Sequence, residues 1–409
     1  MEPVSALLED ARRLLPEIIA VRRALHRQPE VGIDLPHTQR TVLRALAGLG
    51  PAVTTVTGER LTSVVATLDG ARPGRTILLR ADMDALPQTE ETGLEFASRT
   101  PGLMHACGHD THTAMLVGAA TLLAARREVL AGRVVFMFQP GEELGRGARL
   151  MIEEGVLDPP DGRVDAAFAL HITTRHASGT VHLKPGTQYA ESGTLHITVR
   201  GRGAHAAGPH RGLDPVPVAC EIVQALQVMV TRTVPVYDPA VLTVTRIAAG
   251  GAHNIIPATA EISGIFRVLS DDTRRLIRDG ITRVAEGVAA AHGLVAEVAL
   301  RESTPMVTND PGFTALVTRT ATDLLGPAGV GRMAHPMMGA EDFAYVLQRV
   351  PGAMAFLGAC PPDRQPSQVP DNHSSQVIHD ENAFAVGAAL HAAVAMAYLG
   401  EGGGGGLPV

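Results

Sequence analysis

The chain alternates strand-like and helix-like segments, and this rhythm is interrupted once, between about Tyr189 and Ser303. Before the interruption, short apolar runs end in polar motifs and are separated by amphipathic stretches. That order predicts an α/β domain with a mixed, mainly parallel sheet, and the carboxyl ends of such strands collect functional loops. The expected elements are helices up to residue 27, over Thr38–Leu49 and over His112–Ala125, and strands over Ser63–Leu68, Thr76–Arg80 and Arg133–Phe138.

The interrupting segment has the order β-α-β-β-α-β, which is typical of a ferredoxin-like α+β sandwich. Its expected elements are Thr194–Arg200, Pro215–Thr231, Val241–Ala248, Ala258–Arg267, Asp271–His292 and Leu294–Arg301. A chain of 409 residues exceeds the usual size of one core, so a second domain is expected. We predict a catalytic domain in two parts, residues 1–188 and 302–400, an inserted domain of residues 189–301, and a flexible tail of residues 401–409.

Charge and composition indicate a small-molecule substrate. The net charge is −7 without a basic cluster, so neither nucleic acid nor an anionic membrane is expected as a partner. The first residues resemble an amphipathic helix rather than a secretion signal, which predicts a cytoplasmic protein. Three cysteines are an odd number and predict no disulfide framework; Cys220 and Cys360 are expected to be small buried residues.

The segment MHACGHDTHTAML places Cys107 and His109 two residues apart, in a Gly-containing turn that opens a helix. In a turn, both side chains can reach one metal ion, so we interpret them as ligands. A helix-capping cluster with one satisfied histidine is the alternative. His171, at the end of an apolar strand, and His373, in a polar loop, are further candidates, although isolated histidines are more often structural.

The motif FQPGEE places two adjacent carboxylates after a strongly strand-like run. Adjacent side chains in extended chain point opposite ways, so Glu143 can bind a metal while Glu142 acts as general base. The alternative is a solvated helix start, where acids are favoured. Asp84, in LRADMDALP, is a candidate to orient a metal-bound histidine, with an Asx turn before Pro87 as the alternative.

Five donors at separate loop ends would then converge: Cys107, His109, Glu143, His171 and His373. They contain too few carboxylates for Mg²⁺ or Ca²⁺, and they suit Zn²⁺, Mn²⁺, Co²⁺ or Ni²⁺.

The ordered set LHRQPE, LRADMDALP, MHACGHDTHTAML, FQPGEE, ALH, GRGAHAAGPH, HNIIP, GAEDF and DNHS resembles the M20 metallopeptidase family, in particular its D-type amidohydrolases. The resemblance implies a zinc-peptidase-like catalytic domain with two divalent ions, an inserted lid that forms the dimer contact, and a homodimer or homotetramer. It assigns the ligands to the five donors above and the base to Glu142. Other branches carry a GHxDxxP-type motif where this chain has Asp82, which favours an amidohydrolase over a peptidase.

The resemblance also implies roles for three residues of the inserted domain. His205 and Asn254 match residues that approach the substrate in relatives, with the histidine often reaching across the dimer. Arg267 matches an arginine suited to the substrate carboxylate. By themselves, His205 and Asn254 would be ordinary turn residues. Glu341, in GAEDF, receives no firm role.

The predicted reaction is hydrolysis of the amide bond of an N-acyl amino acid to a carboxylic acid and a free amino acid. Water activated by the ions would lose a proton to Glu142, and His205 would stabilise the oxyanion. Four alternatives stay open: a dipeptidase or carboxypeptidase, a carbamoyl-amide hydrolase, a thiol hydrolase with Cys107 as nucleophile, and a catalytically idle metal-binding or ligand-sensing protein.

Overall fold

The computed structural model describes residues 4–159 and 162–400, and the predicted tail of residues 401–409 lies outside them. The described residues form two compact units. Unit 1 contains those up to Gln188, Thr308–His335 and those from Asp342 onward, and unit 2 contains Tyr189–Val307 and Pro336–Glu341. The sequence prediction places the second boundary after residue 301, whereas strand pairing continues as far as Thr304.

Unit 1 is built on an eight-stranded sheet with the strand order β1-β2-β4-β3-β5-β16-β6-β15. The central strands β4, β3, β5 and β16 run parallel to one another, and antiparallel pairs occur toward the edges. The strands are β1 (Val53–Thr57), β2 (Val64–Asp69), β3 (Arg72–Asp82), β4 (Ala131–Gln139), β5 (Ala166–Ala177), β6 (Val181–Leu183), β15 (Val330–Arg332) and β16 (Gly352–Cys360); β7 (Gly186–Tyr189) and β14 (Val307–Asn309) pair separately.

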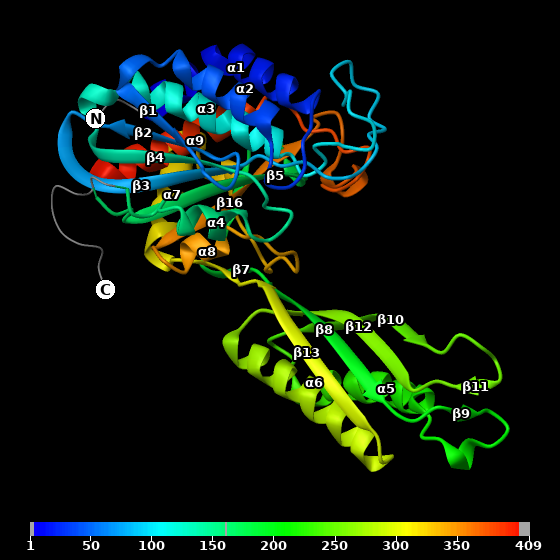
Figure 1. Cartoon of the computed structure of the whole chain (residues 1–409). Coiled ribbons are helices and arrows are strands. Elements are labelled where there is room, and N and C mark those ends of the chain that lie inside the picture. The colour runs from blue at the N-terminus through cyan, green and yellow to red at the C-terminus, as the bar shows by residue number, and fades with distance from the viewer. Residues whose placement is uncertain (1–3, 160–161, 401–409) are drawn as a thin grey trace. The chain divides into compact units, whose positions relative to one another are not determined.

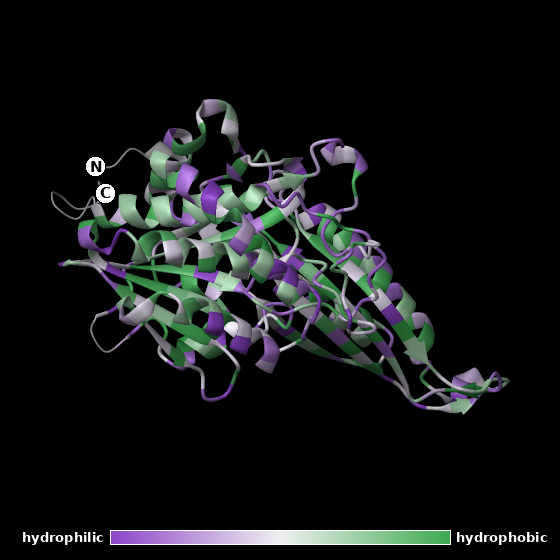
Figure 2. Ribbon diagram, turned by 90° about the horizontal axis from the view of Figure 1, so that it is seen from above, coloured by the Kyte–Doolittle hydropathy of each residue, from purple (hydrophilic) through white to green (hydrophobic). Residues whose placement is uncertain are grey.

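Helices cover this sheet, and α3 and α9 lie side by side against β3 with α1 packed over both (Figure 1). The helices are α1 (Val4–His26), α2 (Pro36–Ala47), α3 (His109–Ala124), α4 (Gly147–Glu153), α7 (Pro311–Leu325), α8 (Ala344–Leu347) and α9 (Ala383–Gly400). The central strands are hydrophobic along most of their length (Figure 2), as expected for strands covered on both faces.

Helix α9 is the one described helix long and apolar enough to cross a membrane, and most of it is buried inside unit 1. Ala, Val and Leu make up most of its surface, so every side of the helix can pack against neighbours. It contacts α1, α3 and α7 as well as the sheet, as a core helix does.

Unit 2 is an antiparallel sheet with the order β10-β12-β8-β13, covered on one face by α5 and α6 (Figure 1). The strands are β8 (Glu191–Arg200), β10 (Val241–Ala249), β12 (Thr259–Val268) and β13 (Val295–Thr304), and the helices are α5 (Pro215–Thr233) and α6 (Asp271–Ala291). Leu195, Ile197 and Val199 alternate along β8 and are buried beneath the helices. Asp214 and Ser270 cap α5 and α6 through their side chains.

The predicted fold class is confirmed, and the differences are local. The third helix begins at His109 rather than His112, because Gly108 adopts a left-handed φ of 90° and allows the turn to start earlier. The second begins at Pro36, a residue favoured in the first turn. Cys360 is buried, but the prediction for Cys220 is wrong: it lies exposed on α5.

Candidate metal centre and catalytic site

The polar motifs of unit 1 follow neighbouring parallel strands. In the pairing of β3 with β4, Asp82 lies opposite Gln139, the last residue before the FQPGEE turn leaves the sheet. On the other side of β3, β5 continues to His171, and α3 begins with His109. Because parallel strands end at the same edge, motifs far apart in sequence meet there.

All five predicted ligands come together at this edge. Cys107 Sγ lies 3.2 Å from His373 Nε2 and 3.5 Å from His171 Nε2. Glu143 Oε1 lies 3.4 Å from His373 Nε2. The potential ligand atoms form two close groups, and within each group they lie within 4.8 Å of one another. One group is Cys107, His109 and His171, and the other is Cys107, Glu143 and His373. Cys107 belongs to both groups.

Buried polar atoms without hydrogen bonds indicate that this cluster fits a metal. Neither ring nitrogen of His109 has a hydrogen-bond partner among the described residues, and neither does Glu143 Oε1. The nearest carboxylate oxygens to the His109 ring belong to Asp84 at 3.5 Å and Asp82 at 3.6 Å. Such groups are costly to bury unpaired, and coordination to a transition-metal ion would satisfy them.

The electrostatics of the cluster also favour a cation. Burial lowers the pKa of His109, but Asp82 and Cys107 outweigh it and raise that pKa well above its ordinary value. Cys107, which lies within hydrogen-bonding distance, and the nearby Glu143 carboxylate raise the pKa of His373 to about 10. His109 and His373 thus hold protons against their anionic neighbours, and a divalent cation could replace those protons.

His112 lies beside the cluster but has both ring nitrogens engaged. Its Nδ1 lies 2.5 Å from Asp82 Oδ1, and its Nε2 accepts from the backbone N–H of Ile172 at 2.8 Å. This fixes the tautomer with the proton on Nδ1. His112 therefore holds Asp82 and β5 together and has no nitrogen left for a metal.

The turn that carries Glu142 and Glu143 is held by Asp84. The two carboxylate oxygens of Asp84 accept from the backbone N–H groups of Glu142 at 3.0 Å and Glu143 at 3.1 Å. Gly141 precedes them with a φ of 77°, a left-handed conformation that favours glycine. Asp84 therefore connects His109, at 3.5 Å, with the glutamate turn, and this second contact was not predicted.

Sequence reasoning also missed a buried polar network around Asp342. Asp342 Oδ1 accepts from Gln139 Nε2 at 2.7 Å and Arg80 at 3.1 Å, and its Oδ2 accepts from the Ala148 N–H at 2.9 Å. The backbone N–H of Asp342 lies 3.4 Å from Glu142 Oε1. An arginine inside the apolar strand of LLRAD requires a buried acidic partner, so Arg80 was the available signal.

The three predicted substrate residues lie in unit 2. His205 ends β9 (Ala204–His205), which pairs with β11 (Ile255–Ile256), and the carbonyl of Asn254 accepts from the Ala206 N–H at 3.0 Å. His205 and Asn254 are therefore neighbours, and both are exposed. His205 Nδ1 accepts from the Ala207 N–H at 3.1 Å, which leaves the ring proton on Nε2.

Arg267 lies on β12 between Ser192 of β8 and Val241 of β10. Its side chain is half-buried, and its buried NH1 group has no hydrogen-bond partner among the described residues. Burial lowers the pKa of its guanidinium. A half-buried guanidinium with an N–H group that lacks a partner is suited to bind an anionic ligand.

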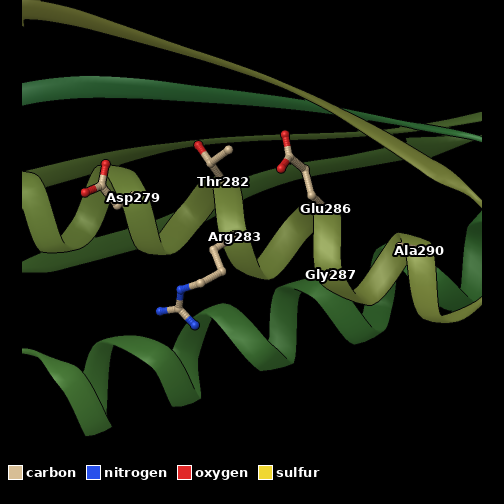
Figure 3. A pocket seen from close by; sticks show the side chains of 6 residues that line it. All are labelled: Asp279, Thr282, Arg283, Glu286, Gly287 and Ala290. Carbon is tan, nitrogen blue, oxygen red and sulfur yellow. The ribbon is translucent and has the colours of Figure 1, made fainter.

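A separate open pocket runs along α6 and contains none of the predicted site residues (Figure 3). Arg283 points from α6 toward the neighbouring helix α5, whereas Asp279, Thr282 and Glu286 point the other way. Acidic and basic side chains alternate along the exposed face of α6, and they do not point toward a common centre as the predicted metal donors do.

The model of peptidase family M20/M25/M40 matches residues 78–397 of the chain, a span that contains every donor described above. The chain belongs to the M20 family. Thermostable carboxypeptidase 1 of Saccharolobus solfataricus is 36% identical over 97% of this chain and 99% of its own length. N-acetyl-L-cysteine deacetylase of Bacillus subtilis is 39% identical over 84% of this chain and 80% of its own length.

Among solved structures, the YXEP protein of Bacillus subtilis, described as a dinuclear metal binding peptidase from the M20 family, matches with a TM-score of 0.82 and 32% identity. The match covers 95% of this chain and 99% of that chain. The predicted family is confirmed, and this M20 protein is an enzyme of the amidohydrolase type.

Proposed function

We propose that this M20 enzyme cleaves the amide bond of N-acyl amino acids to give a carboxylic acid and a free amino acid. The observation that carries the proposal is the meeting of five metal donors with the carboxylate of Glu142 at one sheet edge. The potential ligand atoms of His109, Glu142 and Glu143 also lie within 4.8 Å of one another, so the proposed base lies beside two of the donors.

Five residues would hold two divalent ions: Cys107, His109, Glu143, His171 and His373. The mixture of thiolate, imidazole and a single carboxylate favours Zn²⁺, Mn²⁺, Co²⁺ or Ni²⁺. When bound, the ions would polarise the amide carbonyl and make water more acidic. Asp84 would orient His109 and, through the backbone of the glutamate turn, both Glu143 and the base.

Glu142 would take a proton from the attacking water and then deliver it to the nitrogen of the leaving amino acid. Its side chain is largely buried, so the transferred proton is shielded from bulk solvent. His205 would donate from Nε2 to the oxygen of the attacked carbonyl, and Asn254 would contact the substrate beside it. Arg267 would bind the carboxylate of the amino acid through its fork of donors.

The identity to thermostable carboxypeptidase 1 favours a second candidate, release of a carboxyl-terminal amino acid from a short peptide. Both reactions would use the same base and the same carboxylate contact at Arg267. They differ in what lies on the acyl side of the bond, which is a simple acid in one case and a peptide in the other.

A hydrolysis screen separates the two candidates. Purified protein would be supplied with each of the four metals and incubated with acetyl, benzoyl, long-chain and indole-acyl amino acids, and with dipeptides and blocked peptides of the same carboxyl-terminal residue. We expect the highest kcat/KM for an N-acyl amino acid. Faster cleavage of peptides would favour the carboxypeptidase, and no hydrolysis with any metal would contradict both.

We further propose a cytoplasmic enzyme that acts as a homodimer or homotetramer, with no nucleic acid or membrane partner. Gel filtration with light scattering would measure the oligomer, and a mixture of H205A and E142Q subunits would test whether His205 serves the neighbouring site. If it does, mixed dimers recover activity that neither variant has alone.

A further inference from the structure

Asn372 joins three segments that carry predicted metal donors. It directly precedes His373, and its Nδ2 donates to the carbonyl of Cys107 at 2.8 Å and to the carbonyl of Ile172 at 3.0 Å. Its Oδ1 lies 3.4 Å from His379 Nε2. A single amide thus uses both of its N–H groups on backbone next to the metal cluster.

The two carbonyls that Asn372 contacts belong to the segments of Cys107 and His171. The Ile172 carbonyl also accepts from His171 Nδ1 at 2.7 Å, which turns the ring so that Nε2 faces Cys107 Sγ. A shift of this carbonyl would rotate the His171 ring with it. Asn372 therefore acts on the separation between His171 and Cys107 without contacting either side chain.

The third donor, His373, has an unusual backbone that Asn372 helps to hold. Its φ is 70°, and it is the one described residue other than glycine with a positive φ. Its N–H donates to the carbonyl of Ala106 at 2.8 Å. A left-handed histidine persists where surrounding contacts hold it, and the Asn372 amide supplies two of those contacts one residue away.

We propose that Asn372 is a positioning residue that sets the spacing of Cys107, His171 and His373 and thereby the affinity of the metal centre. The inference rests on the proposed function, because those three residues are taken as ligands. Asn372 contacts backbone groups rather than ions or substrate, so its effect is on the geometry of the donors.

Two substitutions and one control test this role. N372D keeps the shape but removes both N–H donors and places a carboxylate against two carbonyl oxygens, and N372A removes the amide without adding charge. N382D alters another asparagine of the same part of the chain, exposed to solvent and bonded to Asp380. Each protein would be stripped of metal and titrated with Co²⁺ against a competing chelator.

We expect Co²⁺ binding weakened by about 10- to 100-fold in N372D and N372A, the range typical when a group that orients a ligand is lost. The absorption of the thiolate–cobalt bond at Cys107 should fall or shift in both variants. N382D should match the wild type in affinity and spectrum. Circular dichroism and melting of the metal-free proteins would establish that the variants are folded, and N372S replaces any variant that is not.

Wild-type affinity together with an unchanged cobalt spectrum in folded N372D or N372A would overturn the inference. This result differs from failure of the proposed function. If the wild type binds Co²⁺ but hydrolyses no N-acyl amino acid, the reaction is wrong and the affinity comparison still decides the role of Asn372.

Discussion

At the scale of single residues, adjacent glutamates are given different surroundings. Glu143 lies against His373 and has a buried oxygen without a hydrogen bond, as a ligand would. Burial raises the pKa of Glu143, but His373 and His109 outweigh it and lower that pKa, which keeps the carboxylate charged. Glu142 instead approaches the backbone N–H of Asp342. The turn imposed by Gly141 and Asp84 separates the two side chains.

The substitution E142Q tests the base directly. Glutamine keeps the size and the hydrogen-bonding oxygen but cannot take a proton, so kcat should fall by about 10²- to 10⁴-fold, the usual contribution of general acid–base catalysis. Metal content, measured by elemental analysis, should not change. The exposed Glu59 provides the control E59Q, which should keep full activity. Ordinary turnover by E142Q would remove the base assignment.

At the scale of elements, the site depends on turns that close the ends of strands. Gly108 has a φ of 90°, and a Cβ there would come within 2.5 Å of the Ile172 side chain, so no other residue fits where α3 begins. The glutamate turn after β4 likewise depends on the Asp84 carboxylate. These contacts bring β3, β4, β5 and α3 into one fixed arrangement.

The substitution D84N should loosen the glutamate turn. One amide oxygen cannot accept from both N–H groups, and the new NH₂ group faces a donor, so at least one buried N–H loses its partner. The expected cost is about 1 to 3 kcal/mol of unfolding free energy, with weaker metal binding. Urea denaturation and metal titration would measure these effects. D34N, at an exposed aspartate, should change neither, and equal stability of D84N would contradict the bridging role.

Helix α9 carries a buried histidine that should make the fold sensitive to acid. Burial, with a smaller contribution from His112, lowers the pKa of His391 to about 3, and its ring contacts Phe168 in the core. Between about pH 6.5 and 3 the unfolded chain binds a proton that the folded chain does not. The free energy of unfolding therefore decreases as the pH is lowered through this range, by about 1.4 kcal/mol per pH unit for this residue.

H391L should remove that part of the pH dependence. We expect the variant to lose less unfolding free energy than the wild type between pH 6.5 and 5, measured by urea denaturation of the metal-free proteins. H335L changes an exposed histidine, which meets water in both states, and should keep the wild-type slope. A slope for H391L as steep as that of the wild type would show that other groups cause the acid sensitivity.

At the scale of the whole molecule, the metal cluster connects distant parts of unit 1. Its predicted donors come from the start of α3 and the residues before it, the turn after β4, strand β5 and the loop before α9. A bound ion would therefore act as a cross-link between segments that separate on unfolding. Any ligand that binds the folded state alone stabilises it by mass action.

Removal of metal should lower both activity and thermal stability. Treatment with a chelator followed by dialysis should abolish hydrolysis and reduce Tm, and adding Zn²⁺, Mn²⁺, Co²⁺ or Ni²⁺ should restore both, with Tm rising with free metal concentration. Calorimetry would follow the transition. A chelated sample that remained fully active would instead support the thiol hydrolase with Cys107 as nucleophile.

The sequence by itself determined the element order, the fold class and the family, and it predicted the donor residues. Local patterns carry this information, because hydrophobic periodicity sets helices and strands and the motifs at strand ends are short and ordered. It assigned His109 and Asp84 to the site, but it did not indicate what His112 and Asp82, which lie in the same short motifs, would contact.

The tertiary structure decided those contacts, because it sets which side chains can form hydrogen bonds with one another. His112 is occupied by Asp82 and the Ile172 backbone, while His109 keeps two nitrogens without partners. Asp84 caps the glutamate turn from the loop after β3, and Arg80, Gln139 and Asp342 meet in one buried network. Such contacts join residues far apart in the chain, so they depend on which strands lie next to one another, and a short motif does not specify this order.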